Sequence, residues 1–509
     1  MKFNFAKVLS FKELAVLILI YALLILCFGF NWSGNDMIEV IPVLKNFHDG
    51  SLYPNDFFIN YIKSQNLYER SFYIKFLQAT CGTSRSGLFA IHLLFTLSLI
   101  IALYKIGTYF ISEKFANYVL IILLLFFASR TSLGGNELYY NMPVSSFFAK
   151  ALGSWAIYLI FVRRYYLCSS FLIVSTLFHP IVGIQIFVIL IGGLLLHFRS
   201  VLPNFKKVLV PALLYLAITL PYLSMLFLKT LSIHGHYNIL FDILEFRVGH
   251  HFFIEYASIS SILFYLLFIT LGFYYYKIKN KFIYYSFIFQ FLMLVLYIVM
   301  VSVFKSELFL KLQWLKTTIW IELFGIIALV EISFSKLKYS NLTEQAKKNV
   351  RYVCFSVLLL GISLLIIKNN YYNVERQAHL EERALASFAK NHTGKEATFI
   401  TPADFYLFKS NAERSSWIDF KAIAHHPAYL IPWYDRISTL YQINLNDRKM
   451  KHNLISEANR HYKQIDADKI NYLKSQGVNY MIQYKDVAIP SLNVSKVFET
   501  NRFVVYELD

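Results

Sequence analysis

Apolar runs of about 20 residues recur from residue 12 to residue 368, and they constrain the fold more than any other feature of the sequence. A helix needs roughly that length to cross the hydrocarbon core of a bilayer. There are about eleven such runs, two of them short for a span. Hydrophobic residues make up 57% of the 509-residue chain, against roughly 45–50% in an ordinary soluble domain. The sequence therefore predicts a mainly α, polytopic membrane protein with about 11 transmembrane helices.

Every second loop between these runs is rich in Lys and Arg, as cytoplasmic loops are. The basic residues of these loops are Lys2, Lys7, Lys12, Lys105, Lys114, Arg163, Arg164, Arg199, Lys206, Lys207, Lys277, Lys279, Lys281, Lys336, Lys338, Lys347, Lys348 and Arg351. The alternation predicts that the N-terminus lies inside and that residues after about 370 lie outside. The opening acidic segment and the tail then share one compartment.

This orientation depends on how the stretch from Tyr165 to Phe198 is divided. We predict two short helices that turn at His179-Pro180, because proline disfavours helix at the preceding residue and breaks the hydrogen-bond ladder. One long tilted helix is the alternative. It would place the basic segments 277–281 and 336–351 outside, which the charge rule disfavours.

The formal charge of +18 and the four cysteines exclude two classes of protein. The positive charge follows the loops of a membrane protein, so no nucleic-acid partner is expected. Cys27, Cys168 and Cys354 fall in apolar runs, which supports neither a disulfide framework nor a metal-thiolate cluster. The first run, Leu14 to Phe30, has no small-residue cleavage site after it and is expected to be a retained anchor.

The character of the chain changes near residue 373. Residues 1–372 are expected to form the transmembrane domain, with an acidic first outer loop at 32–86. Residues 373–509 are expected to form a small extracytoplasmic α/β domain. Its predicted strands are EATFI, VNYMIQY and RFVVYEL, and its predicted helices are NVERQAHLEERALASFAKN and DADKINYLKSQG.

Three outer-loop carboxylates are candidate catalytic groups. Asp36 follows the first apolar run, and Glu39 shares its face if residues 36–41 are helical. A capping box is an alternative of equal weight. In it, the Asp36 side chain caps the first amides of the helix and the Glu39 side chain bonds back to the start of the helix. Glu137 lies in GGNELYYNMP (134–143), where solvation alone would also explain a loop carboxylate.

Basic side chains elsewhere are candidate phosphate contacts. Arg247, His250 and His251 lie in EFRVGHHF, where Arg offers a bidentate fork and His a hydrogen bond; interfacial anchoring is the alternative. Lys316 lies in an apolar run, where a charge usually faces a cavity or partner such as an anionic headgroup. Metal binding by these histidines with the HGH of 234–236 lacks a recognised ligand spacing.

A fifth stretch, 410–437, is dense in Arg, Trp, Lys and His. Trp417 and Trp433 have the ring faces and polar edges that suit carbohydrate. They suit docking against the membrane domain equally well. With Arg414, and with Asp56 from the first outer loop, they are candidate substrate contacts.

With these residues in view, the chain resembles the GT-C superfamily of membrane glycosyltransferases. It is more similar to uncharacterised bacterial members that share a LYPND-type segment, here residues 52–56. They also share an R-x-x-W-x-D-x-K signature, here Arg414, Trp417, Asp419 and Lys421, and a W-Y-x-R signature, here Trp433, Tyr434 and Arg436. The resemblance extends over the whole chain in layout and is loose in the superfamily's own motifs.

The resemblance implies a transferase of the bacterial cytoplasmic (inner) membrane that takes a sugar from a polyprenyl-phosphate donor. The acceptor would be an envelope glycan, lipid or protein. Asp36 matches the essential first-loop carboxylate, with Glu39 in reserve, although Asn35-Asp36 replaces the usual acidic pair. Glu137 matches a second acid that would position the acceptor or a divalent cation, the one cofactor that the comparison suggests.

Two other hypotheses belong to different classes. A transporter or flippase of a lipid-linked or small solute would carry its ionisable residues near the midplane of broken helices. Most candidates here lie in loops on one predicted side, which favours an enzyme. A non-catalytic GT-C-like scaffold in polysaccharide assembly differs from the enzyme only in lacking a joint site of acids and bases.

Overall fold

The structure is a computed structural model. It describes residues 9–34, 36–65, 67–127, 132–198, 202, 205–231, 237–371, 376–449, 453–487, 489 and 494–508. The chain divides into two compact units. Unit 1 comprises Met1–Phe30, Ala90–Met225 and Val248–Asn370, and unit 2 comprises Asn31–Phe89, Leu226–Arg247 and Tyr371–Asp509. Each unit is described by itself.

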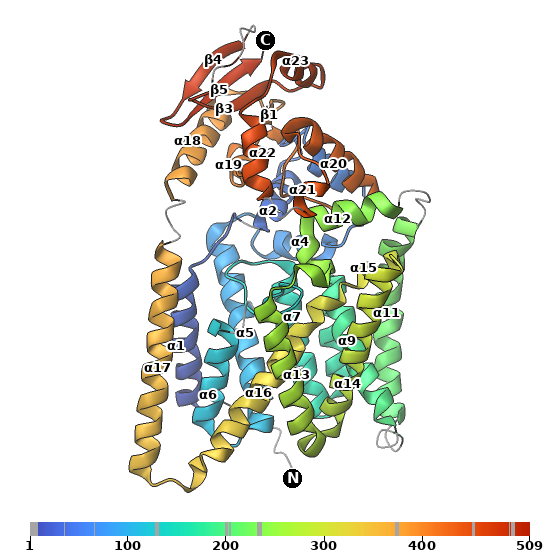
Figure 1. Ribbon diagram of the computed structural model, residues 1–509, viewed down its shortest axis with the longest axis vertical. Coiled ribbons are helices and arrows are strands. Elements are labelled where there is room, and N and C mark those ends of the chain that lie inside the picture. Colours follow the sequence, from blue (N-terminus) through green and yellow to red (C-terminus); the bar gives the residue numbers. More distant parts are fainter. Residues whose placement is uncertain are drawn as a thin grey trace. The chain divides into compact units, whose positions relative to one another are not determined.

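In the described part of unit 1, the regular secondary structure is helical (Figure 1). Its helices are α1 (Phe11–Phe28), most of α5 (Arg85–Phe110), α6 (Lys114–Ile122), α7 (Ser145–Phe161), α8 (Tyr165–Phe178), α9 (Pro180–Leu196), most of α11 (Phe205–Leu231), α13 (Ile259–Lys279), α14 (Lys281–Ile298), α15 (Glu307–Leu312), α16 (Thr318–Lys336) and α17 (Glu344–Tyr371). Short π-helical or 3-10 turns are η1 (Leu123–Phe127), η3 (Ile254–Tyr256), η4 (Val299–Val303), η5 (Trp314–Thr317) and η6 (Tyr339–Asn341).

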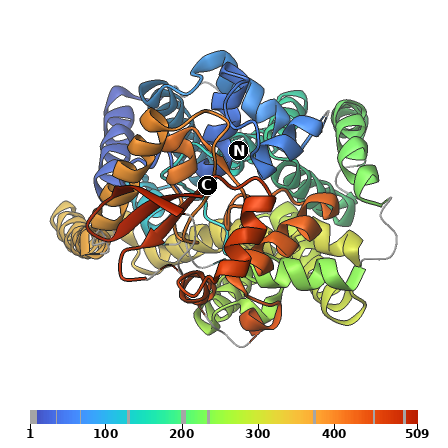
Figure 2. The ribbon, with the colours of Figure 1, turned by 90° about the horizontal axis from the view of Figure 1, so that it is seen from above.

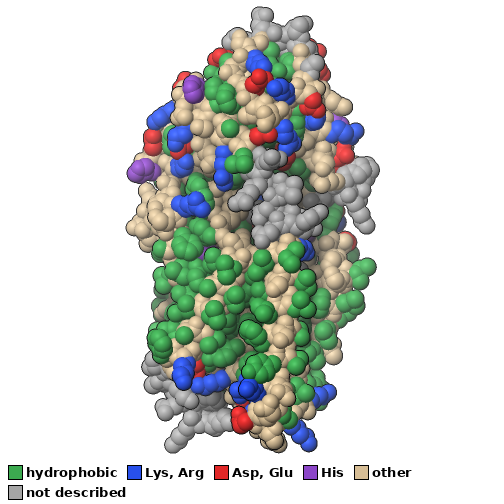
Figure 3. Space-filling model, turned by 90° about the vertical axis from the view of Figure 1, so that its left-hand side faces the viewer, with side chains coloured by type: hydrophobic (Ala, Val, Ile, Leu, Met, Phe, Trp, Pro, Cys, Tyr) green, Lys and Arg blue, Asp and Glu red, His purple; other side chains and the backbone are tan. Residues whose placement is uncertain are grey.

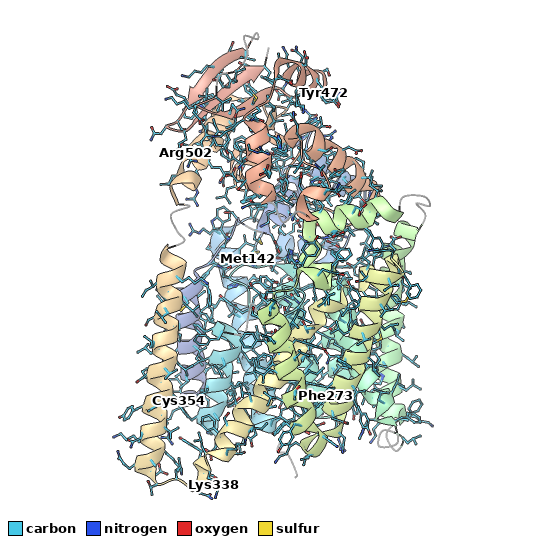
Figure 4. All side chains as sticks on the ribbon, viewed as in Figure 1. Met142, Phe273, Lys338, Cys354, Tyr472 and Arg502 are labelled. Carbon is cyan, nitrogen blue, oxygen red and sulfur yellow. The ribbon has the colours of Figure 1, made fainter. Side chains whose placement is uncertain are left out.

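Many of these helices have the length and composition of membrane spans. In the described residues, 7 helices are long and apolar enough to cross a bilayer, and Lys114–Phe127, α7, α8 and α9 are shorter apolar helices. Hydrophobic side chains gather over the bundle in Figure 3, and Lys and Arg lie at its lower end. Figure 1 places the connections α13–α14 and α16–α17 at that end, and Figure 4 labels Lys338 within the second. The fold class is therefore that of a polytopic helical membrane protein.

The predicted break at His179-Pro180 is confirmed. Helix α8 ends at Phe178 and α9 begins at Pro180, with His179 extended between them (φ −147°, ψ 99°). The His179 ring nitrogen Nδ1 accepts a hydrogen bond from Val182 N at 3.3 Å, which satisfies one free amide of the new helix. Pro180 fits at the first helical position because its missing N–H has no partner to lose there.

Unit 2 combines helices with one mixed sheet. Its helices are α2 (Met37–His48), α3 (Phe57–Ser64), α4 (Ser71–Thr80), most of α12 (Tyr237–Phe252), α18 (Arg376–His392), α19 (Phe408–Ala412), α20 (Pro427–Tyr441), α21 (Asn446–Lys449), α22 (Leu454–Tyr462) and α23 (Ala467–Ser475). Its strands are β1 (Thr398–Ile400), β2 (Ser415–Ser416), β3 (Tyr480–Tyr484), β4 (Val494–Glu499) and β5 (Phe503–Leu508). The three predicted strands are β1, β3 and β5.

The sheet has the order β2-β1-β3-β5-β4, and its strands are seen from above in Figure 2. Strand β1 is parallel to β2 and β3, whereas β3 and β4 are antiparallel to β5. The register of β3 with β5 runs from Tyr480 opposite Glu507 to Tyr484 opposite Phe503. The short connection between β4 and β5 suits an antiparallel pair. The C-terminal part is thus a small α/β structure, as predicted.

Candidate active site

Asp36 stands at the start of α2 with an exposed side chain. Within the described part of the chain its carboxylate makes no capping hydrogen bond, and its backbone is already helical (φ −72°, ψ −12°). The capping-box alternative is therefore wrong. A capping residue needs extended backbone to turn its side chain toward the first amides, and Asp36 lacks it. Its carboxylate is left facing solvent.

Glu39 lies one turn further along α2, and its side chain is only 11% exposed. Its carboxylate forms an ion pair with the guanidinium of Arg70 and accepts a hydrogen bond from Ile423 N at 3.3 Å. Burial raises the pKa of the Glu39 carboxyl, and the Arg70 charge opposes that rise. Glu39 thus ties the segment before α4 and a loop of the tail to α2, and it is less open to substrate than Asp36.

Arg247 and Lys421 bring two cations into the same part of unit 2. The Arg247 guanidinium donates to Phe420 O at 3.2 Å and to Lys421 O at 2.9 Å. Burial lowers the pKa of the Lys421 ammonium, the carboxylates of Asp36 and Glu39 raise it, and Arg247 lowers it. Asp36, Glu39 and Arg247 thus all act electrostatically on Lys421.

We name Asp36, Glu39, Arg70, Arg247 and Lys421 the Asp36 cluster. Its members come from α2, the residue before α4, α12 and the loop after β2. Two half-buried cations near each other suit an anionic ligand such as a phosphate. The exposed carboxylate beside them suits a second molecule that reacts through a hydroxyl group. The sequence predicted Asp36, Glu39 and Arg247 as site residues, whereas Arg70 was missed and Lys421 was noted only within a tail signature.

A second cluster lies in unit 1, around a loop that we name the Gly134 loop, residues 132–140. Gly134 approaches the chain at Lys316 so closely that an added Cβ would lie 2.6 Å from Lys316 N. Gly135 has φ +59°, a left-handed conformation, and its added Cβ would lie 3.0 Å from the His250 ring. Both glycines are therefore required by their surroundings.

Histidine and amide groups fasten this loop. His251 Nδ1 lies 2.7 Å from Gly134 O, so this nitrogen carries the proton, since a carbonyl can only accept. Asn136 Nδ2 donates to Lys316 O at 3.3 Å, and Leu133 N donates to Thr318 Oγ1 at 3.1 Å. The structure thereby gathers three of the predicted stretches in unit 1: the loop that carries Glu137, the histidine pair, and the turn that carries Lys316.

The predicted residues thus fall into two clusters. Asp36, Glu39 and Arg247 belong to unit 2, and Glu137, His250, His251 and Lys316 belong to unit 1. Helix α12 passes from one unit to the other at Val248, whose backbone is non-helical (φ −141°, ψ 36°). That break explains why adjacent members of EFRVGHHF serve different clusters.

Asp56 and Arg414 are buried and bonded to neighbouring backbone. Asp56 caps α3 through Ile59 N at 2.9 Å, and its other oxygen accepts from Ser416 N at 3.0 Å. Arg414 donates to Lys390 O at 2.7 Å and to Thr393 O at 2.6 Å, at the end of α18. We leave both outside the proposed site, because these contacts hold the first outer loop and α18 to the tail.

The two tryptophans are also interior residues of unit 2. Trp433 is fully buried and donates from Nε1 to Asp419 O at 2.9 Å. Trp417 is 3% exposed, and the guanidinium of Arg436 lies 4.9 Å from its ring centroid. Buried indole rings cannot stack on a sugar without opening the unit, so they too stay outside the proposed site.

No group of three or more His, Cys, Asp or Glu residues that could hold a metal ion occurs in the described part of the chain. His234 and His236 of the HGH segment, and Asn35, lie outside the described residues.

Comparisons with known proteins bear on the fold. A family model described as a domain of unknown function (DUF6798) matches residues 381–440. No curated protein matches the sequence. The crystal structure of ArnT from Cupriavidus metallidurans bound to undecaprenyl phosphate has 11% sequence identity, covers 97% of each chain and gives a TM-score of 0.54. The chain shares the fold of this ArnT structure.

Two crystal structures of the Archaeoglobus fulgidus oligosaccharyltransferase are also similar, at 11% identity. One is tethered by a disulfide bond to an acceptor peptide containing the NVT sequon; it covers 93% of this chain and 69% of that one, with a TM-score of 0.47. The other is the apo form, with 92% and 69% covered and a TM-score of 0.46. The fold likeness to ArnT extends over nearly the whole chain and includes both units.

Proposed function

We propose that the protein is a membrane glycosyltransferase that transfers a sugar from a polyprenyl-phosphate-linked donor to an envelope glycan, lipid or protein. The observation that carries the proposal is the Asp36 carboxylate, which is exposed at the start of α2 and does not cap that helix. The GT-C-like fold supports it, and so does ArnT, a similar structure that is bound to undecaprenyl phosphate.

The Asp36 cluster contains the groups that this reaction needs. The acceptor hydroxyl oxygen forms a bond to the anomeric carbon of the sugar, and the bond from that carbon to the donor phosphate breaks. Asp36 accepts the hydroxyl proton as general base. Arg247 and Lys421 stabilise the negative charge that develops on the departing phosphate. The proton ends on Asp36, and the electron pair of the broken bond ends on the phosphate.

We assign Glu137 to positioning the acceptor or a divalent cation, and His250, His251 and Lys316 to hydrogen bonding with phosphate oxygens. Their grouping around the Gly134 loop supports these roles. We also propose the bacterial inner membrane as the location, with the N-terminus inside and residues 373–509 outside, on the strength of the alternating basic loops.

The test compares envelope glycans and lipids from wild type, a deletion strain, and strains that carry Asp36→Asn or Asp49→Asn. Asp49 is the matched control, because it is another loop acid of unit 2, 40% exposed, whose ion pair with Lys395 lies at the surface. We expect Asp36→Asn to reproduce the deletion profile, with transfer reduced about hundredfold or more. Asp49→Asn should keep the wild-type profile.

Two results would contradict the proposal in different ways. Full restoration of the wild-type profile by Asp36→Asn would remove Asp36 as the base. A deletion that changes no glycan or lipid would remove the transferase itself and favour the non-catalytic scaffold.

A further inference from the structure

Lys150 is a fully buried cation in unit 1 that none of the roles above uses. It lies in α7, one of the shorter apolar helices, and its side chain has no exposed area. A charged side chain in such a helix is costly and normally serves a specific partner. The identity of that partner therefore indicates what Lys150 does.

The Lys150 ammonium contacts three residues of the Gly134 loop. Nζ donates to Asn136 Oδ1 at 2.6 Å and to the carbonyl oxygen of Glu137. It also lies 4.5 Å from the centroid of the Tyr140 ring, within the range of a cation–π contact. These contacts make Lys150 a support for the loop.

Other hydrogen bonds join the residues of the supported loop into a network. Asn136 Oδ1 accepts from Lys150 and also from the Tyr140 hydroxyl at 3.3 Å. Asn136 N donates to Ser132 Oγ at 2.7 Å, and Ser132 Oγ donates to Asn136 O at 2.6 Å. His92 Nε2 lies 2.8 Å from Tyr140 O. In a buried network, loss of one charged donor leaves several acceptors without a hydrogen bond, which destabilises the network.

We propose that Lys150 is a positioning residue that holds the Gly134 loop, and with it the Glu137 carboxylate, in the geometry used for transfer. It acts through Asn136 and the Glu137 carbonyl and does not touch substrate. The role of Lys150 in catalysis rests on the proposed function of Glu137. Its effect on the conformation of the Gly134 loop can be measured without any enzymatic activity.

Hydrogen exchange of the full chain in lipid nanodiscs tests the hold directly. Lys150→Met keeps a long, unbranched side chain and removes its donors. We expect amide exchange in peptides covering 132–142 to rise on the order of tenfold or more. Ser154→Ala is the matched control: Ser154 is equally buried one turn along α7, and its hydroxyl donates to Lys150 O within the same helix at 2.9 Å. It should leave the loop peptides unchanged.

Each outcome decides between support and refutation. Unchanged exchange in 132–142 would overturn the proposal. Equal increases in peptides from α8 and α14 would make Lys150 a general stability residue and would overturn it as well. If Lys150→Met fails to accumulate, Asn136→Ala removes the acceptor instead, and the same rise confined to the loop is required.

A transfer assay separates this inference from the proposed function. With an active wild type, Lys150→Met should lower kcat about hundredfold with little change in the donor KM, as expected for a misplaced group. A loosened loop with unchanged kcat would refute the positioning role while leaving the transferase intact. A loosened loop in a protein without any transfer activity would refute the transferase while leaving the hold of Lys150 on the loop intact.

Discussion

Glu413 joins two lysines of unit 2 from different segments. Its carboxylate lies 2.6 Å from Lys45 Nζ on α2 and 2.9 Å from Lys390 Nζ on α18, and its side chain is 18% exposed. Burial raises the pKa of the Glu413 carboxyl, but the two ammonium groups outweigh it and leave the pKa below its ordinary value of 4.5. The charged carboxylate is therefore favoured by folding.

This lowered pKa gives a prediction with a definite sign. The stabilisation is present above pH 4.5, the unfolded value, and is lost as the pH falls through the lower folded pKa. We expect Glu413→Gln to lower the free energy of unfolding of unit 2 by about 1 kcal/mol at pH 7 and to flatten the acid limb of its stability curve. Thermal unfolding between pH 3 and pH 7 measures both. Glu457→Gln is the control, since Glu457 pairs with Arg460 within its own helix; an equal change there would contradict the prediction.

The roles of single residues could be predicted from the sequence to different extents. Asp36 could be proposed because it follows the first apolar run. Lys150 has a recognisable signal as well, because it is a lysine within an apolar stretch. We used that signal for Lys316 but not for Lys150. Arg70 has no such signal in the sequence. An arginine in a polar loop looks the same whether it lies at the surface or forms a buried ion pair, as Arg70 does with Glu39. That distinction depends on burial, which only the folded chain defines.

At the level of elements, the break between α8 and α9 follows from local chemistry, and their packing depends on a glycine. An added Cβ at Gly183 would lie 2.2 Å from Oγ1 and 2.5 Å from both N and Cα of Thr176, so backbone as well as side chain blocks it. Small residues allow helices in membranes to approach this closely. The break could be predicted from the sequence, whereas the close approach at Gly183 could not.

We therefore expect Gly183→Ala to force α8 and α9 apart and to destabilise unit 1 by about 1–3 kcal/mol. The measurement is thermal unfolding of the detergent-solubilised full chain, followed by tryptophan fluorescence. Gly50→Ala is the matched control, because nothing lies within 4 Å of its added Cβ. Equal unfolding temperatures for the two variants would show that the helices accommodate the extra carbon.

At the scale of the whole molecule, the sequence predicted the fold class, the presence of many apolar helices and three strands of the tail from periodicity. It did not predict that the first outer loop belongs to the same compact unit as the tail. The contacts responsible join residues more than 300 positions apart, such as Asn55 N to Ser415 Oγ at 3.1 Å. Local patterns carry no information about such pairs. Tail residues predicted to contact substrate are instead buried among these contacts.

The tail should consequently fold poorly without the first outer loop. Removing the loop would strip Lys409 of Asp56, 3.4 Å from it, and would expose Tyr429, whose ring stacks on Phe57 with centroids 4.9 Å apart. Of the described residues, Lys409 would keep only Asp419 as an ion-pair partner, and both the weaker pairing of a buried charge and the exposure of a large ring destabilise the tail. We expect a fragment of residues 376–508 to unfold without a cooperative transition, and a fusion of residues 31–84 through a flexible linker to 376–508 to unfold cooperatively. Circular dichroism during heating distinguishes the two, with the fusion carrying Asp56→Ala as an intermediate case.

If the isolated fragment unfolds as cooperatively and at the same temperature as the fusion, the loop adds nothing to the stability of the tail. The arrangement of the Asp36 cluster must then be held by other contacts.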